Sequence, residues 1–332
     1  RRHTRLQGDW SSDVCSSDLL LTAGFVAFTN GANANCKGVA SLYGSGTTSL
    51  RLALWWGTFC TFGGAVCAVF LSRGILQAFS GQGLVDTALL QRSQFLISVG
   101  AGAAGTSFLG TRFSFPVSTT HALVGALLGA GMAAGGYGGV QWPGLFERFL
   151  FPLLVSPLLA MICGAVIYCG LRQTGLAPQQ RTGWLDWCHF LSTGAASFAR
   201  GLNDAPKMAA LLTVLPWLSA YGAIALVAIV MAAGGLLDSK NVAETMARRV
   251  TGMDPGQGFS ASLVTAVLVG TASLHGLPAS TTHVSVGALT GMGLVSGRTY
   301  WRKVLEILVV WITTVPCGAI LAAVVFQVSD VF

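Results

Sequence analysis

Long apolar segments without a charged residue dominate this chain. There is no Asp, Glu, Lys or Arg between Lys207 and Asp238, from Pro255 to Gly297, or from Phe113 to Phe146. A helix that crosses a membrane needs about 20 mostly apolar residues. The second and third of these segments are longer than one crossing, so each must turn back, break or re-enter the membrane. The pattern therefore predicts an all-α membrane protein, built as a polytopic helix bundle.

The same pattern predicts ten apolar segments, two of them re-entrant. Charged residues in 73–94 and 238–257 indicate loops or interfacial helices between these segments. The Lys and Arg residues of the loops do not separate into two sets, so the positive-inside rule does not fix the membrane orientation. The expected segments are 19–36, 52–72, 95–111, 113–136 (re-entrant), 149–171, 187–215, 217–237, 258–276, 278–297 (re-entrant) and 303–328.

Composition supports the membrane interpretation and excludes other classes. Charged residues make up 9% of the chain, against about 25% in a soluble domain. The hydrophobic fraction is 53% and the mean hydropathy is +0.66. A soluble enzyme, a disordered protein and a nucleic-acid binder are therefore excluded, and the lipid bilayer is the expected environment. The 43 glycines suit closely packed membrane helices. The eight cysteines form no CxxC pair, so neither a metal site nor a disulfide framework is expected.

Two pairs of sequence repeats occur in the same order along the chain. NGANANCKGVA at 30–40 matches RGLNDAPKMAA at 200–210 in the Gly, Asn, Lys and final Ala positions. PVSTTHALVGA at 116–126 matches PASTTHVSVGA at 278–288 more strongly, because both contain P-x-S-T-T-H followed by V-G-A. Two repeats in register are not expected by chance. They indicate that the chain consists of two related halves.

The halves define the expected domain organisation. We assign 20–172 to a first transmembrane repeat, 173–186 to a polar linker and 187–328 to a second transmembrane repeat. Residues 1–19, RRHTRLQGDWSSDVCSSDL, are polar and unlike the rest of the chain. Part of this stretch can be encoded by an adapter oligonucleotide of a short-read sequencing kit. We interpret 1–19 as a non-native, adapter-derived segment; the alternative is a genuine polar cytoplasmic tail.

The duplicated P-x-S-T-T-H motif has the chemistry of an anion-binding site. Proline suits the first turn of a helix, and Ser and Thr cap helix starts. A helix that begins inside the membrane directs free backbone N–H groups and a positive dipole end inward, and hydroxyl groups complete an anion cradle. Alternatively, the hydroxyls bond to backbone carbonyls within ordinary helices; the duplication favours the cradle. His121 and His283 are expected to brace the hairpins. The candidate cradle residues are Ser118, Thr119, Thr120, Ser280, Thr281 and Thr282.

The second motif, around G-x-N, contains polar residues in apolar surroundings. Asn33, Asn203 and Asp204 carry oxygens that suit a small hard cation, such as sodium. Gly31 and Gly201 are expected to allow an unwound helix there. Three cations lie close by in the sequence, and two interpretations of them stay open: they neutralise a bound anion, or they cap helix ends and reach to water. These cations are Lys37, Arg200 and Lys207.

At these residues the chain resembles the inorganic phosphate transporter (PiT) family, the sodium- or proton-coupled phosphate permeases. That family carries a G-A-N-D type motif in each half, followed by P-[V/I]-S-T-T-H. The stretch 234–267 is also similar to bacterial members, and the resemblance covers 20–328. It implies two inverted repeats, each with a broken helix and a re-entrant helical hairpin. It further implies that phosphate lies between the hairpin tips on the cradle residues, with the coupling cation beside the Asn/Asp motifs.

The resemblance implies a symporter of inorganic phosphate, driven by a sodium or proton gradient, in the bacterial cell (inner) membrane. No cofactor other than the coupling ion is expected, and assembly into a homo-oligomer stays open. One position departs from the family pattern, because Ala34 stands where the family has Asp. This change removes a carboxylate from the first motif. It leaves two alternatives open: a transporter of another oxyanion such as sulfate, or an inactive or uncoupled member.

Other mechanisms fit the residues less well. An intramembrane hydrolase could use a Ser and the His three residues later, but the chain has no G-x-S-x-G elbow and no evident third partner. Two identical copies suit a symmetric binding site better than a single nucleophile, so an enzyme is not expected. There is also no Walker A motif for an ATP-driven pump.

Overall fold

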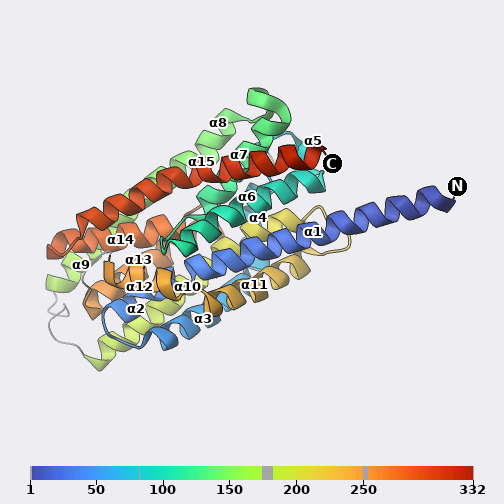
Figure 1. Ribbon diagram of the computed structural model, residues 1–332. Coiled ribbons are helices and arrows are strands. Elements are labelled where there is room, and N and C mark those ends of the chain that lie inside the picture. Colours follow the sequence, from blue (N-terminus) through green and yellow to red (C-terminus); the bar gives the residue numbers. More distant parts are fainter. Residues whose placement is uncertain (1, 82, 174–181, 250–252, 332) are drawn as a thin grey trace.

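The computed structural model describes residues 2–81, 83–173, 182–249 and 253–331. Long helices lie side by side in one bundle (Figure 1). The described residues contain no β-strand, and their one isolated bridge joins Val85 and Val140. Within these described ranges, six helices are long and apolar enough to cross a membrane. The helices are α1 (Arg2–Ala34), α2 (Cys36–Gly44), α3 (Leu50–Leu71), α4 (Arg73–Phe79), α5 (Thr87–Leu90), α6 (Ser93–Arg112), α7 (Thr119–Gly135), α8 (Trp142–Leu145), α9 (Phe151–Gln173), α10 (Gly183–Ala209), α11 (Ala220–Leu237), α12 (Lys240–Arg249), α13 (Pro255–Leu274), α14 (Thr281–Ser296) and α15 (Trp301–Val331), with short 3-10 or π turns at Gly136–Gly139, Phe146–Leu150 and Ala210–Leu212.

The expected apolar segments correspond to long helices. The two charged stretches form short helices, α4 and α5 in the first half and α12 in the second. The polar segment at the start lies within α1, which begins at Arg2. Its non-native origin stays a prediction. The linker 173–186 lies largely outside the described residues.

The expected re-entrant segments, 113–136 and 278–297, supply the second helix of two helical hairpins, α6–α7 and α13–α14, which share the same turn. Their re-entry into the membrane stays a prediction. Each turn contains one residue with positive φ, Ser114 (61°) and Gly276 (68°), at equivalent positions of the two repeats. In the first turn Phe115 N donates to Gly110 O at 2.9 Å. In the second, Leu277 N donates to the carbonyl of the corresponding residue, Ala272, at 2.8 Å. These bonds form a helix-ending motif that satisfies carbonyls left over at the helix C-terminus.

Glycines join each hairpin to the last helix of the other half. A Cβ at Gly125 or Gly129 of α7 would overlap backbone carbonyls of α15. The corresponding glycines of α14, Gly287 and Gly291, meet backbone carbonyls of α9 in the same way. Small residues allow this close approach of two membrane helices. The hairpin of one half is therefore packed against the other half.

The glycines of the G-x-N motifs also serve helix packing. A Cβ at Gly31 of α1 would overlap the carbonyl of Met231 in α11, and one at Gly201 of α10 would overlap that of Thr61 in α3. Both helices are continuous through these glycines, so the expected unwinding at Gly31 and Gly201 is wrong. The interruptions come later, at Asn35 between α1 and α2 and after Ala209, where a 3-10 turn follows α10.

We expect the substitution Asp254→Ala to lower the free energy of unfolding by about 1 kcal/mol. Asp254 caps α13: its Oδ1 accepts from Gln257 N at 2.9 Å, and the Gln257 side chain accepts from Asp254 N at 3.1 Å. Thermal unfolding in detergent measures the loss. Asp254→Asn keeps the acceptor and is the control. An equal loss in both variants would show that capping is not the cause.

Candidate functional site

The tips of the two hairpins meet inside the bundle. Ser118 Oγ and Ser280 Oγ lie 2.9 Å apart, and each side chain is 1% exposed. Each serine also caps its own helix, by accepting from the backbone N–H of His121 or His283. The N-terminal ends of α7 and α14 therefore face each other, as the duplicated motif predicted.

The threonines of each tip bond across to the other hairpin. Thr120 Oγ1 donates to Ala279 O at 3.2 Å, and Thr282 Oγ1 donates to Val117 O at 3.0 Å. These two contacts are equivalent under the repeat. Thr119 and Thr281 are also buried at the helix starts. All six candidate cradle residues thus lie together, and each hairpin supplies half of the site.

The two asparagines of the G-x-N motifs each hold one hairpin. Asn33 Nδ2 donates to Phe115 O at 2.9 Å, and Asn33 Oδ1 accepts from Val117 N at 2.9 Å. Asn203 Nδ2 donates to Ala279 O at 3.0 Å. The buried Asn203 Oδ1 has no hydrogen-bond partner among the described residues. Each asparagine therefore bonds to the backbone just before one of the two tip serines.

Asp204 is the centre of a buried charge network. Its Oδ1 lies 3.2 Å from Lys207 Nζ and accepts from Asn203 Nδ2 at 3.1 Å. Its Oδ2 lies 3.6 Å from Arg200 Nε and accepts from Asn30 Nδ2 at 3.2 Å. Both carboxylate oxygens are therefore already engaged by N–H groups. Asp204 is also the one carboxylate among the buried polar residues of the described part of the chain.

Two lysines reach the hairpin tips from opposite sides. Lys207 Nζ donates to Ala279 O and to Thr120 Oγ1, both at 2.8 Å. Lys37 Nζ donates to Val117 O at 2.6 Å. Each ammonium therefore bonds to the carbonyl that precedes a tip serine. Lys207 has the carboxylate of Asp204 beside it, whereas Lys37 has no carboxylate partner among the described residues.

Asn30 also contacts the site, although the sequence motifs did not assign it a role. Its Nδ2 donates to Thr119 Oγ1 at 2.9 Å, and its Oδ1 accepts from Arg200 at 2.9 Å. It thereby links α1 to the first hairpin and to the charge network of α10. The sequence feature that could have indicated this role is an amide side chain within an apolar segment, one residue before Gly31.

The two imidazoles lie together and contact the last helices of the two halves. The ring centroids of His121 and His283 are 4.4 Å apart, and His283 stacks on Trp311 of α15 at 3.9 Å. His283 Nδ1 lies 3.1 Å from Leu153 O of α9. These contacts fit the expected bracing role.

The predicted cation-binding trio is not one free cluster of oxygens. Asn33 Oδ1 is bonded to the first hairpin, both Asp204 oxygens have N–H partners, and only Asn203 Oδ1 is unpartnered. The described residues also contain no group of three or more His, Cys, Asp or Glu side chains arranged for a metal ion. Cation binding by this trio stays a prediction.

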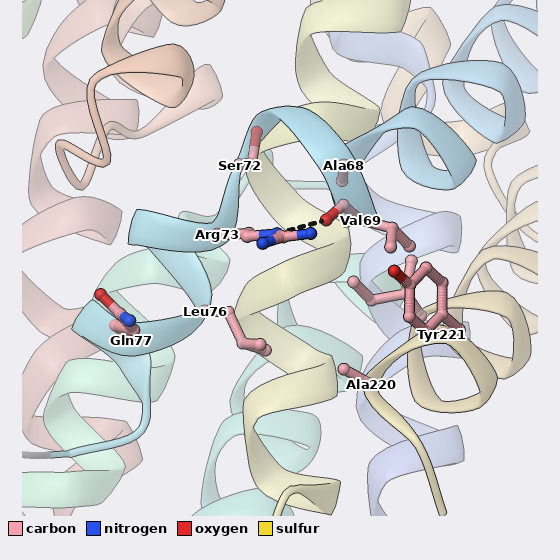
Figure 2. A pocket seen from close by; sticks show the side chains of 9 residues that line it. Ala68, Val69, Ser72, Arg73, Leu76, Gln77, Ala220 and Tyr221 are labelled. Carbon is pink, nitrogen blue, oxygen red and sulfur yellow. Dashed lines mark hydrogen bonds between the residues drawn. The ribbon is translucent and has the colours of Figure 1, made fainter.

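A cavity of about 220 Å³ lies away from the tips (Figure 2). It is formed at the bend between α3 and α4, where Arg73 Nε donates to Val69 O at 3.3 Å, and Tyr221 of α11 also lines it. None of the candidate site residues lines it. A larger apolar cavity of about 520 Å³, between α9 and α13, borders Pro278 and Ala279 at the second tip.

Comparison with known proteins identifies the family. The profile of the "Phosphate transporter family" matches residues 30–184 and again 172–322. The chain belongs to this family. A "Probable low-affinity inorganic phosphate transporter" of Rhizobium meliloti is 26% identical over 94% of this chain and 96% of its own length. A protein of the same description from Mycobacterium bovis is 28% identical over 92% of this chain and 75% of its own.

A solved structure shares the fold of this phosphate transporter family member. The structure titled "The sodium-dependent phosphate transporter" superposes with a TM-score of 0.83. It covers 96% of this chain and all of the other, at 22% sequence identity. Together with the six apolar helices, these matches make the chain an integral membrane transporter rather than an enzyme.

Proposed function

We propose that this chain is a secondary transporter of inorganic phosphate in the bacterial cell (inner) membrane, driven by a sodium or proton gradient. The observation that carries the proposal is the buried meeting of Ser118 and Ser280, with two helix N-termini and two lysines around them. This combination suits an oxyanion, because hydroxyls, free N–H groups and ammonium groups all donate to its oxygens. Family membership supports phosphate as that oxyanion.

Transport requires the two tips to separate. The serine hydroxyls contact each other directly, so an oxyanion that binds between them replaces this bond with bonds to its own oxygens. Each hairpin is packed by glycines against the last helix of the other half. A movement of α6–α7 together with α15 against α13–α14 together with α9 would therefore carry one tip away from its partner. This is the type of motion expected for transporters that have a site between two repeats.

The coupling ion belongs to the same proposal. A related structure is titled a sodium-dependent phosphate transporter, and Asn203 Oδ1 offers an unpartnered buried oxygen. A gradient is a sufficient energy source, since one charge moving through 100 mV gains about 2.3 kcal/mol. Uptake of radiolabelled phosphate into vesicles, under an imposed sodium or proton gradient, identifies the ion. Uptake whose rate depends on neither gradient would contradict the proposed coupling.

The variants Ser118→Ala and Ser280→Ala are each expected to reduce phosphate uptake at least tenfold. Each substitution removes a hydroxyl that would bond to the anion and also the cap of α7 or α14. A lost hydrogen bond to a charged group costs about 1.5–3 kcal/mol. Thr313→Val is the control, because Thr313 is exposed on α15 and bonds only within its helix. Intact uptake in both serine variants would rule out this cradle.

Sulfate is the second candidate substrate, because Ala34 leaves the first motif without a carboxylate. A carboxylate that faces the substrate favours phosphate, since it accepts a hydrogen bond from a protonated phosphate and repels sulfate. With Asp204 alone, that discrimination is weaker. Inhibition of phosphate uptake by sulfate measures it.

A further inference from the structure

We propose that the site binds its oxyanion in the doubly charged form, HPO₄²⁻, and that Lys37 sets this preference. Lys37 has no carboxylate partner, because residue 34 is Ala. The inference rests on the proposed function, phosphate binding at the hairpin tips, and specifies the ionic form of that substrate. It follows from the count and the positions of the buried charges.

The charges at the tips are unbalanced. Three cations, Lys37, Arg200 and Lys207, and one carboxylate, Asp204, are each at most 6% exposed. Two positive charges therefore remain without a protein counter-charge in the described part of the chain. Burying unpaired charges is unfavourable, so an ion that supplies the missing negative charge is stabilised there.

The two unbalanced charges lie at the tips themselves. Asp204 lies between Arg200 and Lys207, and Lys207 Nζ also contacts Ala279 O, next to Ser280. Lys37 Nζ contacts Val117 O, next to Ser118. One ammonium therefore stands on each side of the serine pair. An anion between the serines would be close to both.

The other groups around Lys37 do not supply the charge. The neighbouring titratable groups on α10 are Arg200, Asp204 and Lys207, and α2 itself adds Cys36. His283 on α14 lies within electrostatic reach of Lys37, but an imidazole carries no negative charge. Helices α1 and α6 contribute neutral polar side chains at the tips, and Lys207 additionally lies 5.5 Å from the Phe79 ring of α4. The counter-charge must therefore come from the substrate.

A doubly charged oxyanion balances this site, and a singly charged one does not. With HPO₄²⁻ bound, the two excess positive charges of the side chains are neutralised, whereas H₂PO₄⁻ leaves one of them uncompensated. A coupling cation that binds at the same time adds its positive charge in both cases, so it does not reverse the preference. An Asp at position 34 would lie three residues before Lys37, as Asp204 lies three before Lys207. That carboxylate would reduce the excess to one charge and shift the preference toward H₂PO₄⁻.

The test measures uptake kinetics in vesicles between about pH 6 and about pH 8, the range in which phosphate loses its second proton. Sulfate is a dianion at every pH in the range, so its inhibition constant reports any change in the charge of the site itself. For this chain, the ratio of the KM for total phosphate to the inhibition constant of sulfate is expected to fall about tenfold as pH rises, in line with the HPO₄²⁻ fraction.

The matched variants are Ala34→Asp and Ala34→Asn, which differ by one charge at nearly equal size. Ala34→Asp is expected to flatten or reverse the pH trend of this ratio and to weaken sulfate inhibition at least tenfold. Ala34→Asn is expected to keep both properties of the parent chain. Lys37→Gln lowers the excess positive charge without adding a carboxylate, so it should behave like Ala34→Asp. It provides the same test if Ala34→Asp does not fold.

The outcomes separate this inference from the function on which it rests. Saturable phosphate uptake whose KM, divided by the inhibition constant of sulfate, does not fall with pH overturns the charge preference and leaves phosphate transport intact. Equal behaviour of Ala34→Asp and Ala34→Asn does the same. A folded protein that moves no phosphate at any pH overturns the proposed function itself.

Discussion

Replacing Asp204 with asparagine is expected to abolish phosphate uptake and to destabilise the protein. The substitution leaves Arg200 and Lys207 without their carboxylate partner inside the bundle. Breaking a buried ion pair on one side costs about 3–5 kcal/mol, because the remaining charge stays buried and unpaired. Asparagine has nearly the same size and shape, so the effect comes from the lost charge and from the replacement of one acceptor oxygen by an N–H donor that faces other donors. Uptake into vesicles measures the function, and the midpoint of thermal unfolding measures the stability.

Two further variants interpret that result. Asp238→Asn changes an exposed carboxylate after α11 and should leave both measurements unchanged. The double variant Asp204→Asn with Lys207→Gln removes one unpaired cation and should recover part of the stability without recovering uptake. Near-normal uptake by Asp204→Asn alone would show that the charge network is not needed for transport.

Adding one methyl group at Gly129 is expected to lower both the stability of the protein and its phosphate uptake. A Cβ on this residue of α7 would overlap the carbonyl of Ala319 in α15. A backbone carbonyl cannot move aside as a flexible side chain can, so α7 and α15 must separate. Overpacking of this type costs about 1–3 kcal/mol. For Gly129→Ala we expect a lower unfolding midpoint in detergent and a loss of uptake, since α7 carries the first tip.

The same helix provides the matched control. Gly135 lies near the end of α7, and a Cβ there would have no neighbour within 4 Å. Gly135→Ala should therefore leave the unfolding midpoint within about 1 °C of the parent. Gly291→Ala on α14, opposite the carbonyl of Met161, should match Gly129→Ala. A Gly129→Ala protein as stable as Gly135→Ala would show that the helices do not depend on this contact.

Much of the architecture follows from the sequence alone. The apolar segments and their lengths predicted the long helices, since a membrane requires each backbone group to bond within its own helix. The uncharged segment 255–297 is longer than one crossing and predicted the turn between α13 and α14, whereas 113–146 begins after α6 and covers only the second helix of the first hairpin. The repeated P-x-S-T-T-H motif located both tips, because a helix start with Ser and Thr caps is a local feature. Local chemistry of this kind can be read without knowing the partners.

The tertiary structure decided which parts meet. The local sequence does not predict that α7 packs against α15 and α14 against α9, because glycines allow close approach to any helix. The role of Gly31 and Gly201 was misread for the same reason: a glycine that fits an unwound helix also fits a tight helix crossing.

The site itself shows the same division. The sequence determined that this chain carries two hydroxyl-rich helix starts, three cations and one carboxylate in apolar surroundings. The spacing along α10 already places Asp204 about one helical turn from both Arg200 and Lys207. Only the fold decided that Asn30 joins these charges to the first hairpin and that Lys37 reaches the tips without an acid beside it. Contacts between segments far apart in the sequence depend on distances of a few ångströms, and helix packing sets these distances.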